Sequence, residues 1–310
     1  MFDAFTIVGI GEALFDVYPT GQRLGGAPLN VAVMAHQLAS PHGGRGVVVS
    51  RVGQDRLGSR LVSELRGRGV VTDYIQTDPD RPTGRVFVEL DEAGQPRYDV
   101  ARNVAWDVLS YDFDSEDLAM TCAAVCFGSL AQRDGQCRNS IYRFLDTARQ
   151  AERLFDVNLR DPLPDHRTLR RSCERATILK ANEQELATVA RMLAVGKPGA
   201  GADELAAALM RAFEFELVVL TRGEAGTVLY ERGGAKVEGT EARFEPEAGA
   251  TPVGAGDAVS AAVLVGRVLH WDSQRIADVA NRVGAYVASR AEATPELDEA
   301  VVGGRSADAP

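Results

Sequence analysis

Residues 6–69 alternate between short β-branched runs and longer segments with helical spacing. In order they read TIVGIG (6–11), PLNVAVMAHQLA (28–39), GVVVSRVG (46–53) and LGSRLVSELRGRG (57–69). The first and third runs are apolar without polar alternation, which is typical of strands that are covered on both faces. This stretch therefore predicts a βαβα unit, in which helices cover both sides of a parallel sheet.

The same alternation resumes after residue 120. It comprises AAVCFGS (123–129), NSIYRFLDTARQ (139–150), RLFDVN (153–158), ATILKAN (176–182), EQELATVARML (183–193), ELAAALMRAF (204–213), ELVVLTRG (216–223) and two helices between Gly254 and Arg290. Residues 16–24 and 82–100 break the pattern, and the latter read as two strands around a turn at Glu92–Gly94. We expect an α/β domain from residues 1–15, 25–81 and 101–302, a small β appendage from residues 16–24 and 82–100, and a disordered tail at 303–310.

The composition excludes several classes of protein. The 310 residues are 45% hydrophobic and 25% charged, which is typical of a globular chain rather than a disordered, collagenous or coiled-coil one. A formal net charge of -10 disfavours binding to nucleic acid or anionic lipid. Four cysteines are too few for a disulfide-stapled fold, and the sequence shows neither a basic leader nor a long apolar run. We therefore expect a soluble, cytoplasmic protein without a nucleic-acid or membrane partner.

A glycine-rich turn precedes a predicted helix in TPVGAGDAVSAAVLVGRVL (251–269). Gly254 and Gly256 flank Ala255, and Asp257 follows at once. Free backbone N–H groups and the positive end of a helix dipole suit a phosphate or a developing oxyanion. An acid beside bound phosphate costs Coulomb energy, which a general base accepting a hydroxyl proton would explain. The alternative is that Asp257 only complements the helix dipole.

Polar residues follow two later strands of the predicted sheet. Asn182 and Glu185 are three residues apart after the strand at 176–182. They could organise hydrated Mg²⁺, or they could form a helix capping box. A Thr-Arg-Gly turn at 221–223 ends the next strand, and nucleotides in open α/β sheets bind beyond such carboxyl ends.

Residues near the amino terminus suit a hydroxyl-rich ligand. Asp16 follows the first strand, and GGAPLNVA places Gly26 and Asn30 at a helix start. The glycines allow close approach, and Asp and Asn side chains can bind vicinal hydroxyls, although Asn30 could instead face the sheet. Arg160, in FDVNLRDP, ends a further strand, where it would bind phosphate or lie on the surface.

Competing motifs are incomplete. Gly9-Ile10-Gly11 continues without the third glycine of a dinucleotide-binding fingerprint, and the Gly196-Lys197 pair does not belong to a P-loop. The four histidines have no metal-ligand spacing, and the sequence has no GxSxG nucleophile elbow.

Six ordered blocks resemble the ribokinase-like (PfkB) carbohydrate kinases, with the fructokinase branch closest. They are GGAPLNVAVMA, SRVGQDRLG, DVNLR, KANEQEL, VVLTRGEAG and GAGDAVSAAVL, and they span almost the whole chain. The resemblance implies a three-layer α/β/α sandwich with a mainly parallel sheet and a small β lid. It also implies transfer of the ATP γ-phosphate to a sugar hydroxyl.

The resemblance also implies roles for individual residues. Asp257 would be the catalytic base, and Gly254, Ala255 and Gly256 would form the anion hole. Asn182 and Glu185 would position Mg²⁺ through water. The remaining positions are Thr221, Gly223, Gly226 and Asn281 for the nucleotide; Asp16, Gly26 and Asn30 for sugar hydroxyls; and Arg102, Asn103 and Arg160 as further sugar-site candidates. The β appendage would be a lid that excludes water, and a homodimer formed through it is a candidate assembly.

The chain departs from the family pattern at two places. Where relatives read Asp-Thr-x-Gly-Ala-Gly-Asp, this chain begins Thr251-Pro252-Val253, so the first acid is missing. Where Gly-Ala-Thr-Pro is common near the end, Glu292 replaces the glycine. Both changes fall in the region associated with a monovalent cation in relatives, and they put such a cation in question here.

Fructose is the expected sugar, because NVAWD (103–107) and YVASRAEATP (286–295) also resemble a fructokinase-like subgroup. A kinase for 2-keto-3-deoxygluconate is the nearest alternative, with Arg102 or Arg160 binding the carboxylate. A nucleoside kinase is disfavoured, because the lid segment offers only Phe87 and Tyr98 to stack on a base. A sugar-sensing protein without turnover is the alternative from another class, and the intact Asp257 argues against it.

Overall fold

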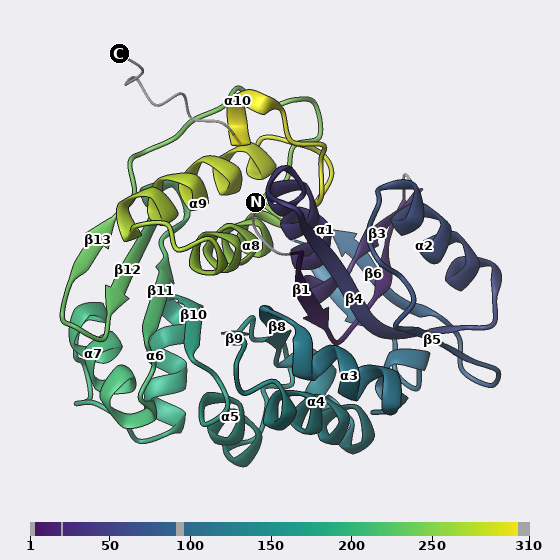
Figure 1. Cartoon of the computed structure of the whole chain (residues 1–310), viewed down its shortest axis with the longest axis horizontal. Helices are drawn as coiled ribbons and strands as arrows, with labels where there is room; N and C mark the ends of the chain where they lie inside the picture. The colour runs from purple at the N-terminus through teal and green to yellow at the C-terminus, as the bar shows by residue number, and fades with distance from the viewer. Residues whose placement is uncertain (1–3, 20, 91–95, 303–310) are drawn as a thin grey trace.

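The computed structural model describes residues 4–19, 21–90 and 96–302 (Figure 1). In this part of the chain, a nine-stranded central sheet has the order β13-β12-β11-β10-β9-β8-β1-β4-β5. The strands in that order are β13 (Lys236–Glu238), β12 (Thr227–Glu231), β11 (Leu217–Thr221), β10 (Ile178–Asn182), β9 (Glu152–Asp156), β8 (Ala124–Gly128), β1 (Phe5–Ile10), β4 (Gly44–Gly53) and β5 (Ile75–Asp78). Pairing is parallel from β11 to β5, and β12 and β13 add two antiparallel strands at the β11 edge.

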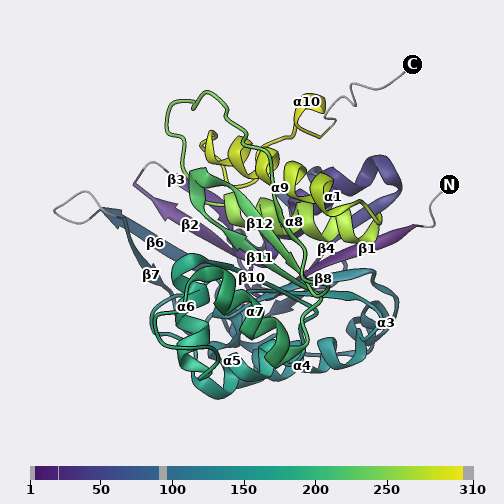
Figure 2. The ribbon, with the colours of Figure 1, turned by 90° about the vertical axis from the view of Figure 1, so that its left-hand side faces the viewer.

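Helices cover both faces of this sheet, as Figure 2 shows. One face carries α1 (Ala27–Ala39), α8 (Ala255–Val268), α9 (Ser273–Ala288) and the short α10 (Glu299–Val302), with α2 (Arg56–Gly67) packed beside β4. The other carries α3 (Phe113–Thr121), α4 (Gly135–Thr147), α5 (His166–Cys173), α6 (Glu183–Met192) and α7 (Ala202–Phe213). Single 3₁₀ turns lie at η1 (Ser40–His42), η2 (Ala105–Val108), η3 (Leu130–Arg133) and η4 (Gly223–Ala225). The mainly parallel, three-layer arrangement predicted from the sequence is confirmed.

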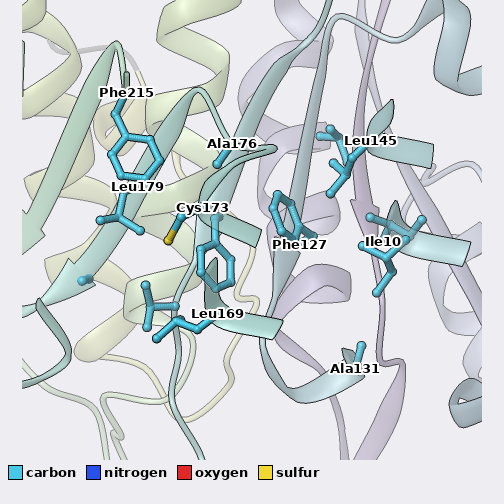
Figure 3. Close-up of a cluster of buried hydrophobic side chains, with 14 of the residues drawn as sticks. Ile10, Phe127, Ala131, Leu145, Leu169, Cys173, Ala176, Leu179 and Phe215 are labelled. Carbon is cyan, nitrogen blue, oxygen red and sulfur yellow. The ribbon is translucent and has the colours of Figure 1, made fainter. Parts of the chain in front are cut away.

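The largest core lies between the sheet and the helices α3 to α7 (Figure 3). Phe127 of β8 and Phe155 of β9 stack at its centre, with ring centroids 5.1 Å apart. Every residue of β8 is buried, as expected for an apolar strand covered on both faces. The four cysteines are buried free thiols: three lie in this core, and Cys126 lies in the core on the other face of the sheet.

A second sheet lies beside the central one, with the order β3-β2-β6-β7. Its strands are β2 (Leu14–Tyr18), β3 (Gly21–Gly25), β6 (Gly84–Leu90) and β7 (Pro96–Val100). We call it the small sheet. It contains strands from both segments that break the sequence pattern, although β2 begins at Leu14 and β3 extends to Gly25. The turn predicted at Glu92–Gly94 and the tail at 303–310 lie outside the described residues.

The elements absent from the sequence-based expectation include β5, α3, α5, α10 and β13. β5 and β13 are short edge strands of four and three residues. Within the part of the chain that the structure describes, no helix is long and apolar enough to cross a membrane.

Candidate active site

The glycine turn before α8 is shaped by close backbone packing. Gly254 has a φ of +87°, and a Cβ atom there would lie 2.3 Å from the carbonyl oxygen of Ala293. Only glycine fits this position. Helix α8 begins at the next residue, Ala255, so the first N–H groups of the helix have no intrahelical partner. The turn thus offers backbone donors to an anion.

Asp257 lies in the first turn of α8, with 9% of its surface exposed. Asn30 of α1 donates a hydrogen bond from Nδ2 to Oδ2 of Asp257 over 2.8 Å. Burial, followed by the charge of Asp156, raises the pKa of Asp257 to about 6. A carboxylate with this pKa is ionised at neutral pH and has more affinity for a proton than an exposed aspartate, as a general base requires.

A buried ion pair lies beside the glycine turn. Nζ of Lys180 in β10 lies 2.7 Å from Oδ2 of Asp156, its direct register partner in β9. Ser260 of α8 donates to the same carboxylate oxygen over 2.9 Å. Burial acts to lower the pKa of Lys180, but the charges of Asp156 and Asp257 outweigh it and raise that pKa. A Cβ atom on Gly256 would lie 2.9 Å from Nζ, so a fixed positive charge stands against the turn.

Lys180 and Asp156 are not among the site residues predicted above. Their signal in the sequence is a lysine inside the apolar run ILKAN, because a lysine at such a position needs a buried partner. The partner itself depends on the strand register, which the sequence does not show.

A cleft of about 370 Å³ opens over these groups, at the carboxyl ends of the parallel strands. Of the predicted residues, it is lined by Asp16, Gly26, Asn30, Arg160, Asn182, Glu185, Thr221, Gly254, Gly256 and Asp257. Val86 and Val100 of the small sheet also line it, so the cleft lies between the two sheets. Such a position is the usual ligand site of an open α/β sheet.

One end of the cleft is acidic. Glu12 lines it with only 2% of its surface exposed, and burial raises the pKa of Glu12 to about 7. Burial, followed by the charge of Asp257, also raises the pKa of Asp16 to about 6. Glu12 follows the first strand directly and is a further functional candidate that the predictions above omit. Three carboxyl groups therefore gather near the start of α1.

Comparisons with known proteins agree with this geometry. The sequence profile described as pfkB family carbohydrate kinase matches residues 12–300. The chain belongs to this family. It is 30% identical to probable fructokinase-3 of Arabidopsis thaliana, over 94% of this chain and 88% of that protein. It is also 30% identical to the fructokinase of Klebsiella pneumoniae, over 87% of each. Among solved structures, a fructokinase with bound ATP from Xylella fastidiosa has a TM-score of 0.77 and 25% identity, and covers 93% of this chain and 94% of that one.

In this pfkB-family chain, Asn182 and Glu185 form the capping box of α6. Oδ1 of Asn182 accepts from the N–H of Glu185, and Oε2 of Glu185 accepts from the N–H of Asn182, both over 2.9 Å. Oε1 of Glu185 accepts from the N–H of Leu159 over 2.9 Å. Each carboxylate oxygen keeps a second lone pair, and both residues line the cleft. Capping and a water-mediated role toward Mg²⁺ are therefore compatible.

A direct metal site is not built into the described residues, which hold no group of three His, Cys, Asp or Glu able to bind an ion. The donors that are present suit Mg²⁺, which keeps several of its waters in protein sites. Asn182 and Glu185 are the residues that would hold it.

Several predicted positions of this family member lie outside the cleft lining. Arg102 and Asn103 are exposed, at the end of β7. Asn281 of α9 is buried, where its side chain accepts from the N–H of Thr227 over 2.8 Å and donates to the carbonyl of Thr240 over 3.0 Å. Gly223 is the first residue of η4, just beyond β11, and Gly226 follows η4; a Cβ on Gly226 would lie 2.7 Å from Nδ2 of Asn281. These three therefore shape the loop next to Thr221, which does line the cleft.

The structure also shows the contacts of Thr251 and Glu292, the two positions at which the sequence departs from the family pattern. Thr251 donates its backbone N–H to the carbonyl of Arg290 over 3.0 Å. Glu292 is exposed over 62% of its side chain and lies 3.7 Å from the guanidinium of Arg68. The carboxylate of Glu292 therefore pairs with a surface arginine. This pairing gives no support to a monovalent cation bound by that carboxylate beside Thr251.

Proposed function

We propose that this chain transfers the γ-phosphate of ATP to a hydroxyl of free fructose. The observation that carries the proposal is the buried Asp257, held by Asn30 in the first turn of α8 and facing the same cleft as Gly254 and Gly256. A base and an anion-binding turn on one helix are the two elements that phosphoryl transfer to an alcohol needs.

The proton moves to Asp257. Because Asn30 occupies Oδ2, we assign Oδ1 to the sugar hydroxyl. The O–H bond breaks as the sugar oxygen bonds to the γ-phosphorus, and the bond from that phosphorus to the bridging oxygen of ADP breaks. Asp16 and Asn30, both in the cleft lining, would bind neighbouring hydroxyls and hold the sugar in line.

The negative charge that builds on the phosphoryl group meets the glycine turn. Gly254 and Gly256 line the cleft, so their backbone N–H groups would stabilise this charge without reorganising. Ala255 is not in the described cleft lining, and its N–H donates to the carbonyl of Pro252 over 3.2 Å. The ammonium of Lys180 adds a positive charge beside Gly256. Mg²⁺, when bound through Asn182 and Glu185, supplies further charge neutralisation of the phosphates.

Fructose is favoured by the relatives named as fructokinases, two of which are 30% identical to this chain over 94% and 87% of its length. The acidic end of the cleft agrees with this choice. Glu12, Asp16 and Asp257 can accept hydrogen bonds from hydroxyls, and the charges of Asp16 and Asp257 disfavour a carboxylated sugar.

A second candidate, 2-keto-3-deoxygluconate, is supported by Arg160, which lines the cleft and could bind a carboxylate. Arg160 is the sole predicted arginine that the described cleft lining includes. The small sheet would act as the lid over either sugar. A homodimer formed through that sheet and a cytoplasmic location stay predictions.

The test is a screen of ADP release with Mg-ATP and single sugars: fructose, 2-keto-3-deoxygluconate, ribose and adenosine. We expect the highest kcat/KM for fructose, because a wrong sugar leaves buried polar groups unpaired. A higher kcat/KM for 2-keto-3-deoxygluconate, lost in Arg160→Met, would replace fructose with the acid. ADP release that no sugar stimulates would favour a sugar-sensing role.

A further inference from the structure

Arg23 joins the small sheet to the wall of the glycine turn. In the antiparallel pairing of β2 with β3, Arg23 lies directly opposite Asp16, so both side chains project from the same face of the small sheet. The guanidinium of Arg23 donates from Nη1 to the carbonyl oxygen of Ala291, which is 268 residues away in the sequence. The ring of Tyr18 lies 5.2 Å from the Arg23 guanidinium carbon and supports it from the same sheet.

The segment that Arg23 binds, residues 289–294, packs on the anion-binding turn. Its backbone accepts hydrogen bonds from the N–H groups of Glu247 and Thr251, at the carbonyls of Ser289 and Arg290, each over 3.0 Å. The carbonyl of Ala293 is the atom that would lie 2.3 Å from a Cβ on Gly254. A shift of this segment therefore changes the space available to Gly254.

A second arginine holds the other end of the segment to the central domain. Arg68, which follows α2, donates from Nη1 to both the carbonyl and the hydroxyl of Thr294 over 2.8 Å. The segment is thus anchored at Thr294 to one part of the chain and at Ala291 to another. The hydrogen bond of Arg23 spans the two sheets, so it persists only while the small sheet keeps its place beside the cleft.

We propose that Arg23 is a positioning residue that couples sugar binding to nucleotide binding. The inference rests on the proposed function, in which Asp16 binds the sugar. A sugar held by Asp16 fixes β2 and its partner β3, and Arg23 then holds residues 289–294 against the glycine turn that receives the phosphates. Each ligand favours the same placement of the small sheet, so each strengthens binding of the other.

The test measures this coupling directly, without turnover. Titration calorimetry gives the Kd of a non-hydrolysable ATP analogue with Mg²⁺, in the absence and presence of saturating fructose. For the unchanged chain we expect fructose to lower the Kd by about fivefold or more, within the usual range of such couplings. We call the Kd without fructose divided by the Kd with fructose the coupling ratio. For Arg23→Met we expect the coupling ratio to fall toward one, while the Kd of fructose alone changes little. Arg23→Lys keeps the charge and one donor group, and should keep part of the coupling.

Arg85→Met is the matched control. Arg85 belongs to β6 of the same small sheet and also stacks on an aromatic ring, with its guanidinium carbon 5.6 Å from the centroid of Phe87. It pairs in register with Phe15, one residue away from Asp16, and so projects from the opposite face. We expect Arg85→Met to keep the full coupling ratio.

Two results would overturn the inference: a full coupling ratio in Arg23→Met, or a ratio of one in the unchanged chain. If Arg23→Met does not fold, Arg23→Lys decides, and an undiminished ratio in that variant counts against the coupling role. Turnover separates the two proposals. If the unchanged chain phosphorylates fructose while coupling is independent of Arg23, the inference fails and the proposed function stands. If it phosphorylates a different sugar, the proposed substrate fails and the coupling is measured with that sugar.

Discussion

Asn30 and Asp257 are 227 residues apart in the sequence, and the side-chain amide of Asn30 lies 2.8 Å from Oδ2 of the Asp257 carboxylate. This hydrogen bond joins the starts of α1 and α8, which pack side by side on one face of the sheet. It fixes the orientation of the carboxylate, and it brings a residue predicted for sugar hydroxyls next to the residue predicted as the base.

The pH dependence follows from the charges around Asp257. The base acts when ionised, so kcat/KM for fructose should rise with pH through about 6 and then level off. Lys180 lowers the pKa of Asp257, so in Lys180→Met the rise of kcat/KM, the acid limb of the pH profile, should occur at higher pH by roughly one unit or more. The double variant Asp156→Asn with Lys180→Met also removes the opposing negative charge and should return the limb toward its original position. Identical limbs in all three proteins would show that this ion pair does not tune the base.

Glu12 should lower the free energy of unfolding at neutral and higher pH. Burial raises its pKa from 4.5 to about 7, so the folded chain holds this proton more tightly than the unfolded chain does. Stability then falls as pH rises through that interval, because the folded state must give up the proton. We expect Glu12→Gln to increase the free energy of unfolding at pH 8 by up to about 3 kcal/mol, and therefore to raise Tm at that pH. At pH 5 both quantities should change little. Glu174→Gln, at an exposed position, is the control and should show no such difference. A lower Tm at pH 8 would contradict the prediction.

Glu185→Gln separates metal positioning from helix capping. The variant keeps an oxygen for the capping box but loses the charge, so the Mg²⁺ concentration needed for half-maximal rate should rise several-fold while KM for fructose stays unchanged. Glu183→Gln is matched to it, because Glu183 is exposed in the same first turn of α6 and lies outside the cleft lining. If the Mg²⁺ requirement is unchanged and Tm falls slightly, Glu185 acts only as a helix cap.

Dependence on potassium should be weak. Thr251 offers a hydroxyl without a charge, and Glu292 is paired with Arg68 at the surface. Initial rates in KCl and in choline chloride, at equal ionic strength and saturating Mg-ATP, should agree within about threefold. Activation by potassium above about tenfold, worth roughly 1.4 kcal/mol of barrier, would contradict this. Loss of that activation in Glu292→Gly would then identify the acid that replaces the missing one.

Local patterns predicted most strands of the central sheet and most of its helices, but they did not predict α3 or α5. The glycine turn and Asp257 are contiguous, and Glu185 follows β10, whose carboxyl end lies at the cleft. Asp16 lies within β2 of the small sheet, and Asn30 lies in the first turn of α1, which follows β3. The Lys180–Asp156 pair could not be predicted in the same way, because it exists only through the register of β9 and β10. The backbone contacts of Asn281 could not be predicted from local patterns either: its side chain binds the N–H of Thr227 and the carbonyl of Thr240, and its role toward the nucleotide stays a prediction. The edge strands β5 and β13 are too short to give a periodic signal.

The central claim is that Asp257 is the base of a fructose-phosphorylating kinase, and Asp257→Asn tests it most directly. The measurement is fructose-dependent ADP release by the variant and by the unchanged chain, together with calorimetric binding of fructose and of a non-hydrolysable ATP analogue. We predict that the rate falls by about 10²–10⁴ while both ligands still bind, because the base acts in the transition state. A variant that binds both ligands and retains more than roughly a tenth of the original rate would contradict the assignment.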